Sequence, residues 1–203
     1  MADYIVLADY KVNHGIPDTS EDVTLTRLIT RASRAVDRFC FREPGGFAGQ
    51  SLTKYLDVAP TPNGRTRISL EVQPLLSVTT FKTDDAGDGV FEVTWTEGTD
   101  FLLYPLNDLP KREIQVNLRT GRYSLPIGQR RVQIVGAWGE AASVPEPIAE
   151  AVELQVSRWR WRLRAPEGVA GNGDVGFVEL KDLDPDVKAI IVNGHYRETV
   201  VFA

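Results

Sequence analysis

The sequence predicts an α+β fold: a helical bundle of two long and two short helices, a small antiparallel β lobe inserted between the long helices, and an extended C-terminal tail. Hydrophobic residues recur at helical spacing near both ends of the chain, whereas β-branched and aromatic residues alternate in short runs through the middle. We predict an N-terminal helical part at residues 1–48, the β lobe at 49–142, the C-terminal helices that complete the helical part at 143–196, and the tail at 197–203.

The N-terminal part is predicted to contain a short helix and a long one. Residues Leu7 to Asn13 form the short helix, and Gly15 provides its C-terminal cap. Hydrophobic residues then recur at helical spacing on one face, and the carboxylates of Glu21 and Asp22 lie in the first turn, where the helix dipole favours negative charge. We therefore predict a long amphipathic helix over residues 21–40.

The middle of the chain is predicted to form short strands. Turn residues separate the runs, and residues 84–89, with the sequence DDAGDG, have the composition of a hairpin turn. The predicted strands are Thr53–Val58, Thr66–Leu70, Leu76–Lys82, Val90–Thr96, Phe101–Tyr104, Glu113–Leu118 and Arg131–Ala137.

The C-terminal part is predicted to begin with the second long helix. Pro145 and Pro147 open it, because proline is tolerated in the first turn of a helix, and the helix runs to about Arg164. Each long helix has one apolar stripe to cover, so we expect the two to pack on each other. After Arg164 we predict a glycine-rich loop at 168–176, a strand-like run at 176–180, a short helix from Pro185 that ends before Gly194, and an extended tail.

Composition narrows the possible functions. A net charge of -5 and a pI near 5.2 argue against a dedicated nucleic-acid binder, which would carry a basic excess. No run of about 18 apolar residues and no signal sequence is visible, so we expect no membrane contact and a protein that is cytoplasmic when made. The single cysteine, Cys40, cannot form an internal disulfide or a cysteine-based zinc site, and we predict a small buried residue there.

Two sets of arginines are the main candidate functional residues. The first interleaves with tryptophan: it forms either a basic helix end with Trp159 in the core, or a positive surface that contacts the phosphates of nucleic acid. The second lies on the long N-terminal helix, where a solvated face is the simpler interpretation. Both sets are equally suited to salt bridges with a neighbouring subunit. The residues are Arg158, Arg160, Arg162 and Arg164 in the first set, and Arg27, Arg31, Arg34 and Arg38 in the second.

The remaining polar motifs predict structure rather than chemistry. Asp84, Asp85 and Asp88 lack the spacing of a calcium loop and are interpreted as a turn, and Asp184 with its acidic neighbours is interpreted as a helix cap. His14 and His195 have no visible partner pattern, and no catalytic or phosphate-binding motif is present. We expect neither enzymatic activity nor a metal or other cofactor.

Four segments together resemble the head-to-tail connector (adaptor) proteins of long-tailed bacteriophages and prophage-like particles. They are LADYKVNHGIPDTSEDVTLTRLITRASRAVDRFCFRE at the start, ISLEVQPLLSVTTFKTDDAGDG and EGTDFLLYP in the β lobe, and RRVQIVGAWGEAASVPEPIAEAVELQVSRW across the start of the second long helix. Each segment alone is a common pattern. Their shared order, from about Leu7 to Tyr196, carries the resemblance.

The resemblance implies a structural protein of the virion neck. Such connectors form a ring of about twelve copies beneath the portal and above the next neck or tail-completion protein. The genome passes through the bore during packaging and ejection, with non-specific contact to double-stranded DNA. Two alternatives remain: another neck protein, such as a stopper or tail-completion protein, and a DNA-packaging accessory enzyme. The segment that would reach the portal contains Tyr196, Arg197, Val200, Val201 and Phe202.

Overall fold

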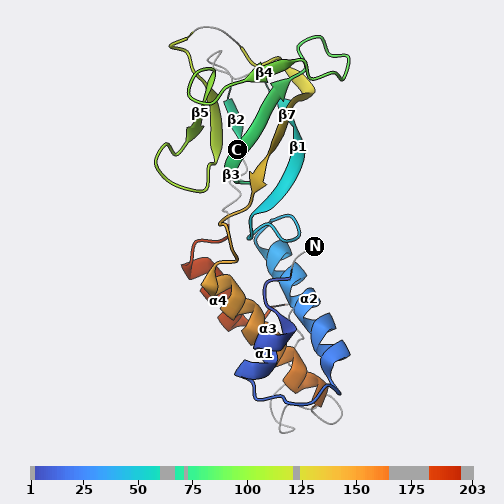
Figure 1. Cartoon of the computed structure of the whole chain (residues 1–203). Helices are drawn as coiled ribbons and strands as arrows, with labels where there is room; N and C mark the ends of the chain where they lie inside the picture. The colour runs from blue at the N-terminus through green and yellow to red at the C-terminus, as the bar shows by residue number, and fades with distance from the viewer. Residues whose placement is uncertain (1–2, 60–66, 71–72, 121–123, 165–182, 198–203) are drawn as a thin grey trace. The chain divides into compact units, whose positions relative to one another are not determined.

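The computed structural model describes residues 3–59, 67–70, 73–120, 124–164 and 183–197, which belong to two compact units. One unit consists of Met1–Gly45 together with Val144–Ala203 and contains the helices, and the other consists of Gly46–Ser143 and contains the strands. Figure 1 shows the elements of each unit. The described residues contain four helices and two antiparallel sheets, so the predicted α+β class is confirmed.

The helical unit is built around an antiparallel pair of long helices. Helix α2 (Asp22–Phe39) packs on α3 (Glu146–Arg164), and the short helices are α1 (Leu7–Asn13) and α4 (Pro185–Asn193). The predicted packing of the two long helices is confirmed. Each buries one stripe of apolar side chains: Leu25, Leu28, Ile29, Ala32, Ala35 and Val36 on α2, and Ile148, Ala151, Val152, Val156 and Trp159 on α3.

Helix α4 illustrates how the local sequence sets a helix boundary. Asp184 caps it, since its carboxylate accepts a hydrogen bond from the backbone N–H of Asp186 at 3.1 Å, and Pro185 occupies the first turn. The side-chain oxygen of Gln155 on α3 accepts the backbone N–H of Asp184 at 2.9 Å. The cap is therefore fixed to α3, and the predicted capping role of Asp184 is confirmed.

The strand unit contains two antiparallel sheets. One sheet has the order β1-β7-β3-β4 and the other has the order β2-β6-β5. Backbone hydrogen bonds between Leu75 of β3 and Lys111, which lies just before β6, connect the two sheets. The strands are β1 (Gln50–Val58), β2 (Arg67–Ser69), β3 (Leu75–Thr83), β4 (Val93–Trp95), β5 (Phe101–Tyr104), β6 (Glu113–Val116) and β7 (Gly128–Trp138).

Both sheets contribute to one hydrophobic core. Phe81 of β3 contacts the ring of Trp95 on β4, with centroids 5.3 Å apart, and the ring of Phe101 on β5, at 4.7 Å. All three side chains are buried. The alternation of buried and exposed residues along β7 shows why these runs form strands, because every second side chain enters this core.

Several predicted boundaries differ from the structure. The predicted strand at 90–96 is reduced to the three residues of β4, because the acidic turn extends further: the backbone N–H of Val90 bonds to Asp88, and that of Asp85 bonds to Glu92. Conversely, β1 and β7 begin three residues earlier than predicted. The predicted loop at 168–176, the strand-like run at 176–180 and tail residues 198–203 lie outside the described residues.

Candidate functional site

Two of the arginines near the end of α3 bind a carboxylate at the start of α2. The Nε of Arg160 donates to Glu21 at 2.8 Å, and the Nε of Arg164 donates to the other oxygen of the same carboxylate at 3.1 Å. The two arginines share a face because they are four residues apart on the helix. Hydrogen bonds from Arg164 and Arg160 hold the pKa of Glu21 below its ordinary value. These two arginines therefore join the end of α3 to the start of α2.

The other two arginines of α3 differ from each other. Arg158 points toward α4, where it donates to Asp186 at 3.0 Å and lies 3.8 Å from Asp184. Arg162 is half-exposed and has no hydrogen-bond or ion-pair partner within the described part of the chain. Trp159 is 8% exposed, which confirms the prediction that it belongs to the core. Two residues further along, Trp161 is 76% exposed.

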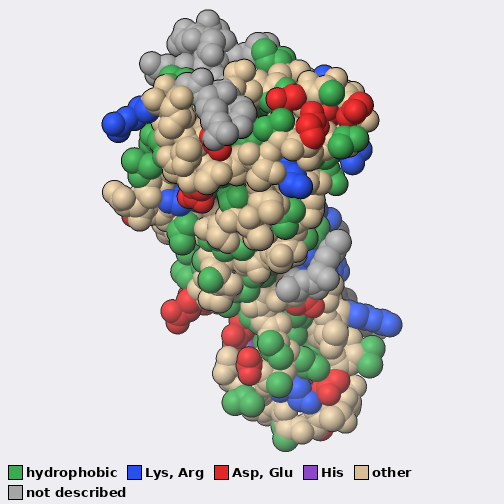
Figure 2. Space-filling model, turned by 45° about the horizontal axis from the view of Figure 1, so that its top comes forward, with side chains coloured by type: hydrophobic (Ala, Val, Ile, Leu, Met, Phe, Trp, Pro, Cys, Tyr) green, Lys and Arg blue, Asp and Glu red, His purple; other side chains and the backbone are tan. Residues whose placement is uncertain are grey.

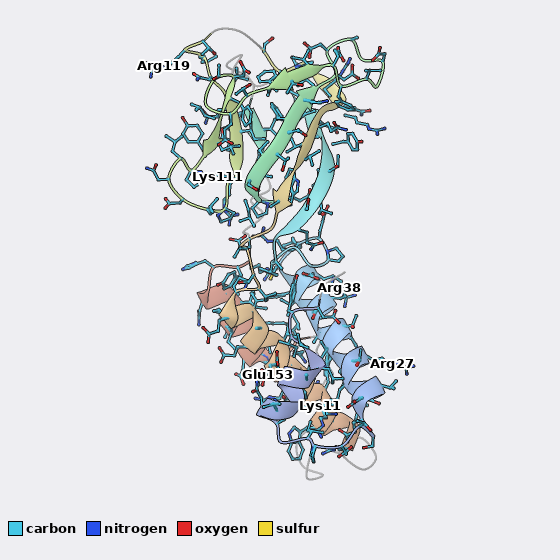
Figure 3. All side chains as sticks on the ribbon, in the orientation of Figure 1. Lys11, Arg27, Arg38, Lys111, Arg119 and Glu153 are labelled. Atoms are coloured by element: carbon cyan, nitrogen blue, oxygen red, sulfur yellow. The ribbon has the colours of Figure 1, made fainter. Side chains whose placement is uncertain are left out.

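The arginines of α2 also fall into two groups, those that contact another residue of the helical unit and those without such a partner in the described residues. Arg31 places its guanidinium 4.6 Å from the ring centroid of Trp159, a cation–π contact between the long helices. Arg34 lies 3.3 Å from the buried carboxylate of Asp37. Arg27 and Arg38, labelled in Figure 3, are exposed, and no hydrogen bond or ion pair to them occurs among the described residues.

The eight arginines thus do not form one continuous basic surface. Five contact other parts of the helical unit, and three remain available for contacts outside the chain. On the face shown in Figure 2, lysine and arginine side chains are scattered among acidic ones. The sequence did not reveal this division, because Glu21, the partner of two of these arginines, lies about 140 residues away along the chain. The available guanidinium groups are those of Arg27, Arg38 and Arg162.

The segment before α1 is held on α2 by a buried polar cluster that the sequence analysis missed. The Tyr4 hydroxyl donates to the carboxylate of Asp37, and the backbone N–H of Tyr4 donates to Ser33 at 3.1 Å. Asp37 is 1% exposed, and this burial raises its pKa, although Tyr4, Arg34 and the N–H of Gly45 favour the charged form. Sequence alone offered no signal, because an aspartate on an amphipathic helix is normally exposed.

Cys40 and the acidic turn behave as predicted. Cys40 is fully buried, and burial raises the pKa of its thiol to about 12, so it is a structural residue. Asp84 accepts the backbone N–H groups of Gly87 at 2.5 Å and Gly89 at 2.9 Å, and it lies 3.6 Å from Arg131. The carboxylates of Asp84, Asp88 and Glu92 each place an oxygen within 4.8 Å of the others. Both oxygens of Asp84, however, accept backbone N–H groups and so shape the hairpin turn.

The two histidines lie at the surface, as expected. His14, however, has the partners that its sequence context did not reveal: it lies 3.1 Å from Glu153 on α3 and its ring is 4.3 Å from that of Tyr10. His195 is exposed after the end of α4. His14 therefore helps to dock α1 on α3.

The start of the C-terminal tail folds onto the helical unit. The backbone N–H of Tyr196 donates to Ile191 at 3.1 Å. The guanidinium of Arg197 lies 4.5 Å from the ring centroid of Phe39, at the end of α2. Val200, Val201 and Phe202 lie outside the described residues.

An open groove of about 590 Å³ runs along α1 and is lined mainly by the apolar side chains of Leu7, Val12, Ile16 and Pro17. Among the described residues, no helix combines the length and hydrophobicity that a membrane-spanning segment needs.

Comparisons with known proteins identify a structural neighbour. No protein-family model matches the chain, and no curated protein matches it by sequence. The structure is similar to a chain in the virion of a native gene transfer agent (GTA) particle, with a TM-score of 0.59 and 17% sequence identity. The alignment covers 98% of this chain and 92% of that chain. The two chains therefore share a fold over nearly their whole lengths.

Proposed function

We propose that this chain is a non-enzymatic structural subunit of a phage-like virion, namely a head-to-tail connector that forms a ring beneath the portal. The observation that carries the proposal is the similarity to a chain of a GTA virion over 98% of this chain, which includes both the helical and the strand unit. The ordered sequence segments that resemble connectors support the same assignment independently.

The exposed side chains of the helical unit suit a protein that works by docking. Trp161 and Leu163 expose 76% and 66% of their surfaces at the end of α3, and single apolar side chains of this size become strong contacts when a partner covers them. Arg27, Arg38 and Arg162 add three guanidinium groups that are available to phosphates or to a neighbouring subunit. In the proposed ring of about twelve copies, each such residue is repeated around the bore.

Contact with the genome is proposed to be weak and independent of sequence. Phosphate contacts from arginines need charge but no base recognition, and they weaken as the salt concentration rises. With a net charge of -5 and five of the eight candidate arginines engaged inside the helical unit, these helices offer few such contacts. A bore of this kind allows DNA to slide during packaging and ejection.

The C-terminal segment is proposed to dock on the portal, and the opposite side of the ring on the next neck protein. In the proposed attachment, Tyr196 and Arg197 fix the start of the segment to the helical unit, and Val200, Val201 and Phe202 supply the apolar contacts. A helical unit of this size favours the connector over a stopper or tail-completion protein, because those neck proteins are expected to be mostly β.

Deletion of residues 198–203 tests the attachment while Tyr196 and Arg197 stay in place. We expect the shortened protein to keep its melting temperature within about 2 °C and to fail to join heads to tails in a complementation assay. Electron microscopy of particles with antibody against the chain should locate the full-length protein at the neck. Particles without the chain would overturn the proposed function, and co-purification with tail tube rather than portal would identify a different neck protein.

A further inference from the structure

Helices α2 and α3 each carry, on the face turned away from the other, a stripe whose end residues are exposed and have no partner within the described part of the chain, whereas Arg34 and Ser157, between those ends, contact Asp3 and Tyr10. The stripe on α2 contains Val23, 66% exposed, and the exposed cation Arg38. The stripe on α3 contains the exposed carboxylates Glu146 and Glu150 and the 76% exposed Trp161. Because each helix turns its buried face toward the other, the two stripes point away from each other, on opposite sides of the helical unit.

The two stripes match in chemistry and in length. Fifteen residues separate Val23 from Arg38, and fifteen separate Glu146 from Trp161, which corresponds to about 22 Å along each helix. The helices run antiparallel, and the contacts of Glu21 with Arg160 and Arg164 set their register. This register places Val23 level with Trp161 and Arg38 level with Glu146.

We propose that the α2 stripe of one copy docks against the α3 stripe of a second copy of this chain. Val23 packs against Trp161, and Arg38 pairs with Glu146 and Glu150. This inference rests on the proposed function, since it assigns the surfaces that would close the ring. Two different stripes on opposite sides of one unit make a head-to-tail contact, which closes into a ring when the rotation between copies allows it.

The charges favour a second copy over nucleic acid as the occupant. The carboxylates of Glu146 and Glu150 repel the phosphates of nucleic acid. An arginine from a second copy, by contrast, donates charge-assisted hydrogen bonds to these carboxylates. The apolar end of each stripe likewise needs an apolar partner, and the exposed Trp161 gains most from being covered. The α2 stripe of a second copy supplies both an arginine and an apolar side chain, at the same spacing along the helix as the glutamates and the tryptophan of the α3 stripe.

Cysteine cross-linking tests the contact directly. The chain with Val23→Cys and Trp161→Cys together should form a ladder of dimers, trimers and larger species under mild oxidation, reversed by reductant. Each single variant should stay almost entirely monomeric, because a head-to-tail contact never brings two identical positions together. Cys40 does not interfere, since it is fully buried and its thiol pKa is about 12. The oxidation is performed on purified protein at high concentration and on particles from producing cells.

A charge exchange provides a second test that does not depend on cysteine geometry. Arg38→Glu should lower the self-association constant, measured by sedimentation velocity, about tenfold. The double variant Glu146→Arg with Glu150→Arg should lower it by a similar factor. Mixing the two variants should restore association, because opposite charges then meet again. The matched control is Arg119→Glu, which reverses an exposed arginine of the strand unit and should leave association unchanged.

The outcomes separate this inference from the proposed function. If particles carry the chain at the neck but neither test detects the contact, the inference is wrong and the proposed function stands. If purified protein forms the ladder but particles lack the chain, the contact stands and the proposed function is wrong. Absence of the ladder in both preparations, with no effect of Arg38→Glu, overturns the inference.

Discussion

The arginines of α2 and those near the end of α3 look alike in sequence but contact different partners. On α3, Arg158, Arg160 and Arg164 bind carboxylates from α4 and from the residue before α2. On α2, Arg38 and Arg27 make no side-chain hydrogen bond or ion pair within the described part of the chain. Helical spacing fixes which arginines share a face, whereas the carboxylates that neutralise them come from other elements. The arginine-rich end of α3 thus connects elements within the helical unit, whereas α2 offers two arginines without an ion-pair partner in the described residues.

The same contrast holds for the two tryptophans of the arginine run. Trp159 lies in the core between α2 and α3 and carries the guanidinium of Arg31 on its ring, while Trp161 is exposed. They lie two positions apart on the same helix, yet one side chain is buried and the other is exposed. Comparing their substitutions isolates what the core contributes from what the surface contributes.

The largest expected effect comes from Trp159→Ala. Truncation of a buried tryptophan leaves a cavity and removes the ring beneath Arg31, so we expect a loss of about 3–5 kcal/mol in the free energy of unfolding. Urea denaturation followed by circular dichroism measures it. The matched control, Trp161→Ala, should change the free energy by less than about 0.5 kcal/mol. Equal effects of the two substitutions would contradict the assignment of one tryptophan to the core and the other to the surface.

A smaller effect is expected from Glu21→Gln, which removes the charge that Arg160 and Arg164 share. At neutral pH the variant should melt slightly below the wild type. The folded-state pKa of Glu21 is depressed below its ordinary value near 4.5, so its contribution is fully present above that pH and is lost as pH falls through the depressed pKa. The melting temperatures of the two proteins should therefore converge in acid.

A pH series of thermal melts on both proteins measures this convergence. The matched control is Glu97→Gln, which changes an exposed carboxylate of the strand unit outside the proposed contact between copies and should not alter the melting temperature at any pH. A difference between Glu21→Gln and the wild type that persists in acid would show that the arginine contacts do not depend on the charge of Glu21.

Much of the helical architecture was accessible from local sequence. The apolar stripe and the acidic first turn predicted residues 21–40, and α2 spans Asp22–Phe39. The prolines and the cap at Asp184 likewise located the starts of α3 and α4. These signals depend on neighbours within one or two turns, so the physics that sets them is contained in a short window.

The parts that sequence did not predict depend on contacts between distant residues. Alternation located most strands but not their partners: β1 pairs with β7, roughly 80 residues later, and nothing in either strand specifies the other. The shared face of Arg160 and Arg164 was predicted, but their partner Glu21 was not. Likewise, Asp37 is buried only because Tyr4 and Gly45 supply hydrogen bonds from other segments.

The smallest expected effect on stability, and the sharpest test of the two arginine classes, comes from Arg162→Gln. This side chain has no hydrogen-bond or ion-pair partner in the described residues, so the free energy of unfolding should change by less than about 0.5 kcal/mol. If Arg162 contacts DNA, the variant should bind a random-sequence duplex more weakly, with a salt dependence shallower by about 0.9 in log–log slope for each lost phosphate contact. Arg160→Gln is the matched control on the same helix: it should leave DNA binding unchanged, because Glu21 already occupies that guanidinium. Fluorescence anisotropy across a salt series measures both variants. An equal loss in the two, or no binding by the wild type, would contradict the proposed role of Arg162.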